Sequence, residues 1–239
     1  VHRLLRHGVV SVPTVLGVTS WSAVNALGAT TAEVVSALEA GRSGLGPCAF
    51  ELPFATVVGA VPGALPPMPA PLARWESRVA RIALLALDGL AAPVERAVRR
   101  WGRERIAVLV GTSTGGILET ERAMRASGPG GPLPAGYDFD RQHAFHALLD
   151  VVRARTGAAG PAWVVSTACS SSAKVLGSAR RLVEAGIVDA AVVGGADSLC
   201  DTTLRGFGAL EALSARPCRP FSAGRDGTNI GEGGAFMLV

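Results

Sequence analysis

A cysteine stands where an apolar stretch of the chain gives way to a helical pattern. Residues 162–166 suit a buried strand, and a helix is predicted from Ser170 onward. Cys169 therefore lies at a helix N-terminus, where unpaired backbone N–H groups and the helix dipole favour an anion. Such a setting favours the thiolate, the form that nucleophilic catalysis requires. Taken alone, however, a cysteine is more often a small apolar core residue than a nucleophile.

The remaining candidate ligand residues indicate no metal centre. The other three cysteines, Cys48, Cys200 and Cys218, form no CxxC pair and show no metal-ligand spacing. Four cysteines are too few for a disulfide scaffold in a chain of 239 residues, which favours a reducing cytoplasm. His143 and His146 stand three residues apart and could share one helix face. Because no cluster of cysteines or carboxylates accompanies them, a surface or interface role is favoured over zinc.

The composition fits a folded protein with no nucleic-acid partner. Apolar residues make up 49% of the chain and charged residues 18%, which argues against disorder. The net charge of +4 is modest and comes from arginine, since Lys174 is the only lysine. A nucleic-acid binder would show its charge beside interleaved aromatic residues, and aromatics are only 5% of this chain. The densest basic run, residues 99–105, is therefore interpreted as a solvated helix end.

The N-terminal residues allow two interpretations. Two arginines followed by the apolar residues 9–18 faintly resemble a signal peptide. Pro13 and Gly17 interrupt that run, and we interpret it instead as a first β-strand over residues 12–19. No stretch reaches the roughly 18 uninterrupted apolar residues of a membrane span, so none is predicted.

Apolar runs alternate with helical periodicity, which predicts an α/β architecture with buried sheets. The predicted strands cover residues 12–19, 106–110, 162–166 and 187–193, and the predicted helices cover residues 30–40, 75–100, 141–155 and 170–185. Pro93 should kink or break the second of these helices. Residues 46–73 are rich in proline and glycine and are predicted to form a long loop, with at most a short strand near 56–60.

A run of small residues follows the strand predicted at 106–110. In Gly111-Thr112-Ser113-Thr114-Gly115-Gly116 the small side chains would let a backbone or a substrate approach closely. A phosphate-binding loop is the alternative. It is only weakly favoured, because no Gly-Lys-Ser/Thr sequence follows the glycines.

Short motifs spread over nearly the whole chain occur in one characteristic order. They are Val15-Leu16-Gly17-Val18-Thr19, Ala26-Leu27-Gly28, Gly41-Arg42-Ser43-Gly44-Leu45, Val165 to Ala173 around the cysteine, Val193-Gly194-Gly195-Ala196-Asp197-Ser198, Gly206-Phe207, Ala212-Leu213-Ser214, Arg219-Pro220-Phe221, Arg225-Asp226-Gly227 and Gly231-Glu232-Gly233. Each motif is weak alone. Together they resemble the β-ketoacyl-acyl-carrier-protein synthases, the condensing enzymes of fatty acid and polyketide synthesis.

The resemblance implies a thiolase-like α/β fold, in which two similar halves each hold a mixed sheet flanked by helices. Residues 1–239 would form mainly the N-terminal half, a β-ketoacyl synthase N-terminal domain truncated before the second half. The apolar run at 235–239 suits a strand cut short, and a natural C-terminal strand is the alternative. The family's two catalytic histidines and its lysine belong to the second half, and no histidine of this chain sits in a matching motif.

The resemblance also implies the chemistry. Cys169 would attack the thioester of an acyl carrier protein as a thiolate, with its own backbone N–H as one oxyanion donor. Malonyl carrier protein would then lose CO₂, and the resulting carbanion would attack the acyl-cysteine to give a 3-oxoacyl product. The substrates are carried on the phosphopantetheine of the carrier protein, so no separate cofactor and no metal is expected.

Two further positions transfer from the family as substrate-binding residues. Phe207 would line the acyl pocket. Thr114 would limit the depth to which the acyl chain reaches, and its small side chain would leave a roomier pocket. By the same resemblance, the protein is expected to form a homodimer or a ketosynthase heterodimer.

Two alternatives stay open. The chain could be a catalytically incomplete fragment or a non-catalytic partner subunit of a ketosynthase dimer, although the chain-length-factor relatives lack the cysteine that is retained here. It could also be a thiolase acting on coenzyme A thioesters, which shares the fold and a cysteine nucleophile. The run from Arg219 to Gly233 argues against the thiolase.

Overall fold

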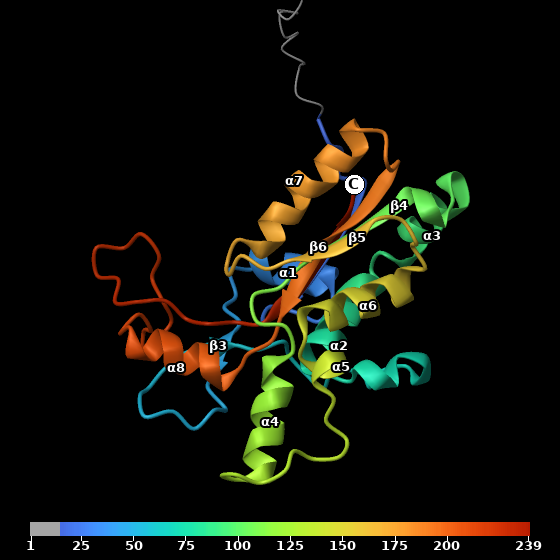
Figure 1. The fold of residues 1–239 in the computed structure, drawn as a ribbon. Coiled ribbons are helices and arrows are strands. Elements are labelled where there is room, and N and C mark those ends of the chain that lie inside the picture. Colours follow the sequence, from blue (N-terminus) through green and yellow to red (C-terminus); the bar gives the residue numbers. More distant parts are fainter. Residues whose placement is uncertain (1–14) are drawn as a thin grey trace, which may run out of the picture.

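A mixed sheet of five strands forms the centre of the computed structural model, which describes residues 15–239 (Figure 1). The strands are β1 Ser20–Asn25, β4 Ile106–Gly111, β5 Ala162–Val165, β6 Ala190–Asp197 and β7 Gly233–Leu238, in the spatial order β1-β7-β6-β4-β5. β4 pairs in parallel with both β5 and β6, whereas β7 runs antiparallel to β6 and β1. A separate antiparallel ribbon pairs β2, Leu45–Pro47, with β3, Val57–Gly59.

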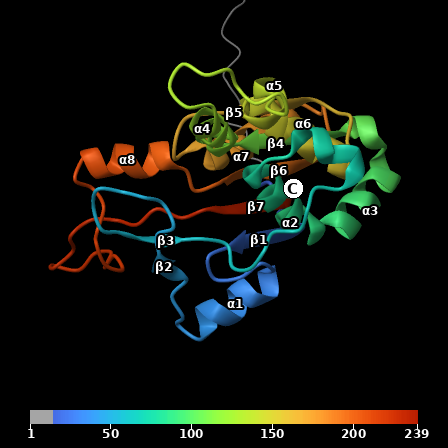
Figure 2. The same cartoon turned by 90° about the horizontal axis from the view of Figure 1, so that it is seen from below.

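Helices cover the two faces of the sheet. The helices of the described residues are α1 Thr31–Glu39, α2 Arg78–Asp88, α3 Ala91–Trp101, α4 Ile117–Ser127, α5 Phe139–Gln142, α6 Phe145–Thr156, α7 Ser171–Glu184 and α8 Asp201–Ala209, with 3₁₀ turns at Ala70–Trp75 and Arg103–Arg105. α2, α3 and α6 pack on one face, and α7 packs on the other. In Figure 2, α1 lies next to β1, where the Thr31 hydroxyl accepts a hydrogen bond from the Ala23 N–H at 3.0 Å.

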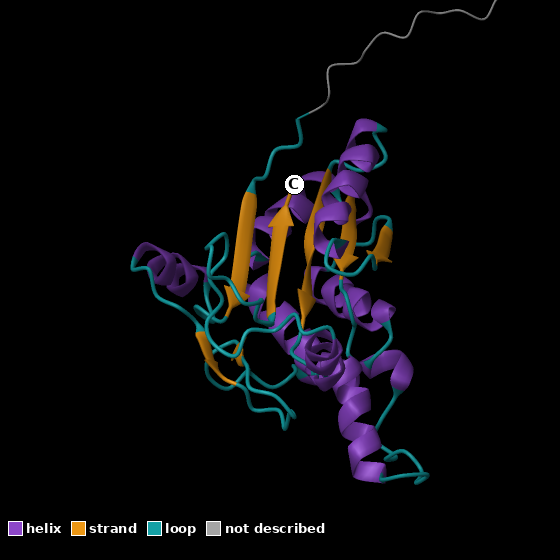
Figure 3. Cartoon of the chain, turned by 90° about the vertical axis from the view of Figure 1, so that its left-hand side faces the viewer, coloured by secondary structure: helices purple, strands orange, loops and turns teal. Residues whose placement is uncertain are grey.

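The alternation of side chains along β4 explains the two cores. All six residues of β4 are buried, as expected for a parallel strand covered on both faces. Val108 and Val110 point into the core under α2, α3 and α6, while Ala107 and Leu109 pack with α7. Figure 3 shows the strands side by side within this layered arrangement. The predicted α/β architecture with a buried sheet is therefore confirmed.

Most of the predicted elements are present. The helices expected at 30–40 and 170–185 and the strands expected at 106–110 and 162–166 lie within one or two residues of their predicted bounds, and β3 falls inside the short strand predicted near 56–60. The helix expected at 75–100 is divided into α2 and α3, but the break is at Gly89 and Leu90. Pro93 instead lies in the first turn of α3, where its missing N–H costs no hydrogen bond.

Three predicted boundaries were wrong. Tertiary contacts explain the first and the third, and a local motif at a helix C-terminus explains the second. The first strand is Ser20–Asn25 rather than 12–19, because these six residues pair in register with Leu238 back to Gly233. Residues 15–19 of the predicted 12–19 strand are not in a strand. Residues 12–14 lie outside the described residues, and so does the part of the signal-peptide-like segment that ends at residue 14.

The strand expected at 187–193 starts only at Ala190 and extends to Asp197. Ile187 belongs to the end of α7, because its N–H bonds to the Leu182 carbonyl at 3.0 Å while Gly186 adopts a φ of +66°. This is a Schellman motif, which satisfies the last carbonyls of a helix.

The helix expected at 141–155 is interrupted between Gln142 and Phe145, so His143 and His146 do not share one helix. The carbonyl of His143 accepts a hydrogen bond from the Gly116 N–H at 2.9 Å, which is incompatible with continuing the helix through that residue. The loop after β4 thus sets the start of α6. None of the helices in residues 15–239 is long and apolar enough to cross a membrane.

A buried carboxylate ties four segments together. Glu232, at the start of β7, is 4% exposed and accepts two hydrogen bonds from the guanidinium of Arg78, one of them at 2.7 Å. It also accepts the backbone N–H groups of Val61 at 3.0 Å and Leu199 at 3.2 Å. The bond to Glu232 raises the pKa of Arg78 above its ordinary value. These contacts join α2, the segment after β3, the end of β6 and the start of β7.

Replacing Glu232 by alanine should lower the free energy of unfolding by about 3 kcal/mol, because it leaves a guanidinium and two buried N–H groups without their acceptor. Chemical denaturation monitored by circular dichroism measures the change. The matched control is Glu95→Ala, which removes an exposed pair with Arg99 at 3.6 Å and should change stability by less than about 0.5 kcal/mol. Equal losses in the two variants would contradict the role given to Glu232.

Candidate active site

The turn between β5 and α7 exposes Cys169. The chain leaves β5 at Val165 and enters α7 at Ser171, with the cysteine side chain exposed between them. Ala168 has a φ of +53°, a left-handed conformation that is uncommon for a residue with a side chain. A sharp turn of this kind between a strand and a helix presents the residue that follows it to solvent. The structure therefore places Cys169 where the sequence analysis expected it, at the entrance to a helix.

Hydrogen bonds to one carbonyl hold this turn. The Ala168 oxygen accepts the N–H of Ser171 at 3.1 Å and the Ser171 hydroxyl at 2.6 Å. The same oxygen accepts the hydroxyl of Ser113 at 3.2 Å, from the loop after β4. The Ser171 hydroxyl in turn accepts the Thr167 N–H at 2.9 Å. These contacts stabilise the uncommon backbone conformation of Ala168.

The loop after β4 is bound to the end of β6. One oxygen of Asp197, Oδ1, accepts the hydroxyl of Thr112 at 2.8 Å and the N–H groups of Ser113 at 2.8 Å and Thr114 at 3.2 Å. The Thr112 hydroxyl also accepts the N–H of Gly115 at 3.1 Å. The loop is thus fixed on one side to Asp197 and on the other side to the turn that carries Cys169.

Two glycines allow α7 to begin directly against the sheet. A Cβ at Gly111 would stand 2.5 Å from the N of Ser172, and a Cβ at Gly195 would stand 2.1 Å from the Gly111 oxygen and 2.3 Å from the Ser172 hydroxyl oxygen. Real Cβ atoms do not approach other atoms this closely. Only glycine therefore fits at these two positions with the observed backbone.

The ends of four strands meet beside the turn. β1, β4, β5 and β6 all run in one direction, so Asn25, Gly111, Val165 and Asp197 lie at one edge of the sheet. Ligands of α/β proteins commonly bind at this edge. A hollow of about 290 Å³, lined in part by Asn25, Asp197 and Ser172, opens there. The arrangement can place a small molecule next to the first turn of α7.

The structure brings two of the three predicted site residues together. Thr114 lies in the loop after β4, and the neighbouring Ser113 bonds from this loop to the Ala168 carbonyl in the turn that carries Cys169. The hydroxyl oxygen of Thr114 is buried without a hydrogen-bond partner. Phe207 is half-buried on α8, which packs instead against the 50–56 segment, since the Phe54 ring lies against Gly208. No described hydrogen bond links α8 to the Cys169 turn, and the role of Phe207 stays a prediction.

His143 supports the loop after β4 rather than a metal. Its Nδ1 lies 2.5 Å from the Thr120 hydroxyl oxygen, which also bonds to the Tyr137 hydroxyl. Burial lowers the pKa of His143 below its ordinary value, and the negative charge of Glu121 opposes that shift in part. Within residues 15–239, no group of three histidine, cysteine or acidic side chains is arranged to hold a metal ion.

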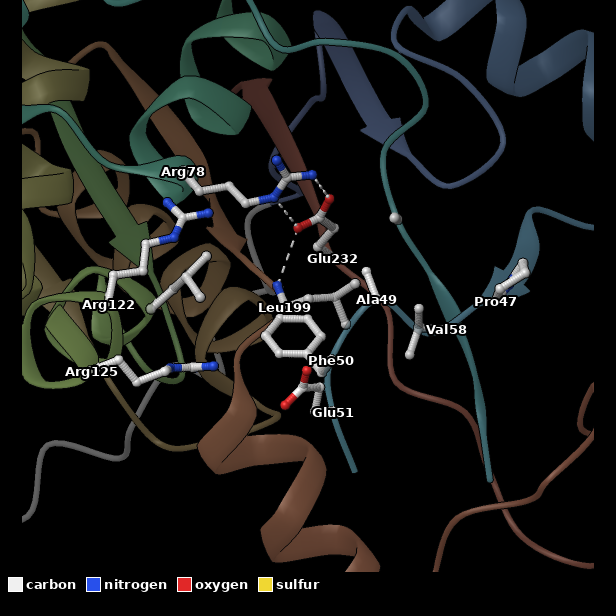
Figure 4. A pocket seen from close by; sticks show the side chains of 12 residues that line it. Pro47, Ala49, Phe50, Glu51, Val58, Arg78, Arg122, Arg125, Leu199 and Glu232 are labelled. Atoms are coloured by element: carbon white, nitrogen blue, oxygen red, sulfur yellow. Dashed lines mark hydrogen bonds and ion pairs between the residues drawn. The ribbon is translucent and has the colours of Figure 1, made fainter. Parts of the chain in front are cut away.

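The lining of a larger groove of about 720 Å³ does not include Cys169 (Figure 4). Arg78, Arg122 and Arg125 reach into it beside the apolar side chains of Phe50 and Leu118. Each arginine faces a carboxylate: Arg78 bonds to Glu232, Arg122 to Glu119 at 3.1 Å, and Arg125 lies 3.5 Å from Glu121. The groove therefore carries no excess of positive charge that would select an anion.

Asp197 and Ser113 are the site residues that the sequence analysis missed. Both were within quoted motifs, Asp197 after the two glycines at the end of β6 and Ser113 in the run of small residues. The available signal was a polar residue at or just after the carboxyl end of a strand, because the carboxyl ends of parallel strands meet at one edge.

The family model for the β-ketoacyl synthase N-terminal domain matches residues 78–239. A 3-oxoacyl-[acyl-carrier-protein] synthase 2 from Staphylococcus aureus is 28% identical over 173 residues, which cover 70% of this chain and 43% of the relative. The enzyme of the same name from Rhizobium meliloti is 34% identical over 143 residues, covering 55% of this chain and 33% of the relative.

Solved structures show the same likeness. A chain from the complex of the ketosynthase ApeO with its chain length factor ApeC from Xenorhabdus doucetiae matches with a TM-score of 0.81 and 35% identity, covering 92% of this chain and 56% of that chain. A β-ketoacyl synthase from Burkholderia phymatum matches with a TM-score of 0.75 and 27% identity, covering 92% and 57%. These matches confirm the thiolase-like α/β fold. The chain spans about half the length of the solved relatives and less than half of the curated ones.

Gly195→Ala should lower the free energy of unfolding by about 3 kcal/mol, because the added Cβ overlaps the backbone of β4 and the first turn of α7. The matched control is Gly206→Ala in α8, where a Cβ meets no atom within 4 Å and alanine favours the helix. Urea denaturation of both variants checks the prediction. A Gly195→Ala variant as stable as Gly206→Ala would contradict the close approach.

His143→Gln should flatten the dependence of stability on pH below neutrality. Because the folded pKa of His143 is lowered from 6.5, the folded state resists protonation more than the unfolded state does. The corresponding stability is present above pH 6.5 and is lost as the pH falls towards the folded pKa. The difference in unfolding free energy between wild type and variant should shrink from pH 7.5 to pH 5. The exposed His146→Gln variant is the control, and a constant difference would contradict the prediction.

Proposed function

Because this chain belongs to the β-ketoacyl synthase family, we propose that the protein is a 3-oxoacyl-acyl-carrier-protein synthase whose acyl group is carried by Cys169. One observation carries the proposal. Cys169 is an exposed residue of a strained, hydrogen-bonded turn that leads from the half-buried strand β5 into a helix. A structural cysteine would be expected inside a core, as Cys200 is, rather than at this position.

Acyl transfer follows from the position of the sulfur. The thiolate of Cys169 attacks the carbonyl carbon of the carrier protein's thioester, and a C–S bond forms to give a tetrahedral oxyanion. The Cys169 N–H and the positive end of the α7 dipole stabilise the negative oxygen. The oxyanion then collapses, the bond to the phosphopantetheine sulfur breaks, and that thiolate leaves and takes a proton from solvent. The product is an acyl-cysteine.

Condensation is proposed for a full-length synthase. Malonyl carrier protein loses CO₂, and the resulting carbanion attacks the acyl-cysteine, which releases the Cys169 thiolate and gives a 3-oxoacyl product. The described residues account for the acyl-carrying step. His143 is given no part in the condensation, because its Nδ1 is hydrogen-bonded to the Thr120 hydroxyl. This chain spans about half the length of the related synthases, and we assign no residue of it to the condensation step.

The substrate-facing residues proposed for the acyl pocket are Thr114 and Phe207. Thr114 supports this role by its place in the loop that contacts the Cys169 turn and by its buried, unpartnered hydroxyl. The role proposed for Phe207 rests on its match to the family's Gly-Phe motif alone. The substrates are proposed to be carried by the phosphopantetheine of an acyl carrier protein, with no separate cofactor.

Subunit assembly is a further part of the proposal. β5 lies at the edge of the sheet and pairs only with β4 among the described strands. An edge strand with free backbone groups is suited to pair with another subunit. We propose a homodimer or a ketosynthase heterodimer, and the ApeO–ApeC complex shows that a related ketosynthase associates with a chain length factor. All four cysteines are free, which supports a cytoplasmic location.

Two other functions are weaker candidates. A non-catalytic partner subunit would not need the exposed cysteine in its strained turn, and a catalytically incomplete fragment would retain acyl transfer but not condensation. A thiolase acting on coenzyme A thioesters would share the fold, but the family match is to the β-ketoacyl synthase domain.

Iodoacetamide at neutral pH should alkylate Cys169 at least about tenfold faster than the half-buried Cys48 and Cys218, because a thiolate at a helix N-terminus is the reactive form. Cys200 should react slowest, since burial raises the pKa of its thiol. Peptide mapping by mass spectrometry measures all four rates in one sample. Incubation with an acyl carrier protein charged with a fatty acyl chain should add that chain to the wild type and not to Cys169→Ala. Alkylation of Cys169 no faster than Cys48 would reject the proposed nucleophile.

A further inference from the structure

We propose that Asp197 is a positioning residue for the nucleophile, acting through the loop after β4. The proposal rests on the proposed function, because it concerns the turn that carries Cys169. Asp197 does not touch that turn itself. Its carboxylate holds residues 112–114, and Ser113 in that loop bonds to the carbonyl of Ala168, the residue before the cysteine.

The first step of the argument is the environment of Asp197. Among the described residues, the carboxylate of Asp197 forms no ion pair. It accepts three hydrogen bonds, one each from Thr112, Ser113 and Thr114. They converge on a single oxygen atom, Oδ1. A carboxylate is a stronger acceptor than a neutral group, so these bonds hold the loop more firmly than an amide would.

The second step is the rigidity of the support. β6 lies inside the sheet, where Gly195 pairs with Gly111 of β4 on one side and Asp197 pairs with Gly233 of β7 on the other. A carboxylate on a strand paired along both edges has little freedom to move. The loop is therefore fixed against a rigid element, which is what a precisely held site requires.

The third step is the strain in the Cys169 turn. Ala168 stays in a left-handed conformation only because the surrounding contacts hold it there. Two of the three donors to its carbonyl come from Ser171, inside the same turn. Ser113 is the one that comes from outside. Removing the Ser113 contact would leave the strained turn supported only by its own residues.

Hydrogen–deuterium exchange tests the coupling without relying on catalysis. In Asp197→Ala, amide exchange should become about tenfold faster in the peptide covering 112–115 and also in the peptide covering 166–172, because both segments lose their fixed partner. Ser113→Ala should speed exchange at 166–172 and leave the amides of 113 and 114 protected. If Asp197→Ala does not fold, Asp197→Asn decides the question, because it removes the charge and keeps the shape of the side chain.

Two variants serve as matched controls. Ser113→Thr keeps the hydroxyl and should restore wild-type exchange at 166–172. Ser198→Ala removes a neighbouring buried hydroxyl that has no hydrogen-bond partner and should leave both peptides unchanged. Asp197→Asn keeps the Oδ1 acceptor without the charge and should give exchange between those of the wild type and Asp197→Ala.

The separate alkylation rates of Cys169 and Cys48 in the same sample distinguish positioning from general loosening. Loosening would speed the alkylation of the half-buried Cys48, whereas a loss of positioning would slow that of the exposed Cys169 alone. We expect the Cys169 rate to fall about fivefold in Asp197→Ala and Ser113→Ala while the Cys48 rate stays unchanged, because the sulfur is no longer held at the N-terminus of α7. Unchanged exchange at 166–172 in both variants would overturn the proposal for Asp197. Slow alkylation of wild-type Cys169 would instead reject the nucleophile and leave the exchange result to decide the role of Asp197.

Discussion

The site depends on how closely the first turn of α7 approaches the ends of β4 and β6. Gly111 and Gly195 leave no side chain between the helix and the sheet, and the Ser172 backbone and hydroxyl occupy the space that a Cβ would fill. This contact sets the direction in which α7 leaves the sheet. It forces the preceding residues into a tight turn with Ala168 in a left-handed conformation, and that turn presents Cys169. The reactive position thus depends on backbone packing at Gly111 on the neighbouring strand β4 and at Gly195 on β6, the strand beyond it.

Local pattern was enough to predict the elements whose partners are close in sequence. The fully buried β4 and the helix that follows Cys169 could be read from apolar runs and helical spacing, because burial on both faces leaves an unbroken apolar stretch. β1 could not be placed in this way. Its sequence, Ser-Trp-Ser-Ala-Val-Asn, is half polar, and its bounds are set by pairing with β7 more than 200 residues later. The early β-branched run was therefore the stronger local signal and the wrong one.

The same limit applies to the site. Cys169 was predictable because its type and its position between a strand and a helix are both local properties. The support for its turn comes from Ser113 and Asp197, which lie 55 and 84 residues away from their hydrogen-bond partners. A single sequence places these residues in motifs but does not show which atoms meet. For Phe207 the sequence suggests a role and the structure does not show it. The motif match assigns Phe207 to the acyl pocket, whereas α8 packs against Phe54.

The position of β7 has a consequence for how the chain folds. β7 is the last of the strands described in residues 15–239, yet it lies between β1, the first of them, and β6. On a ribosome, β1 would have no sheet to join until the residues of β7 had emerged, and Glu232 would reach Arg78 only at the same late stage. Contacts of such long sequence separation form slowly, and an unpaired first strand is open to wrong association. The parallel core of β4, β5 and β6 can assemble first, so β7 and β1 are expected to join the sheet last.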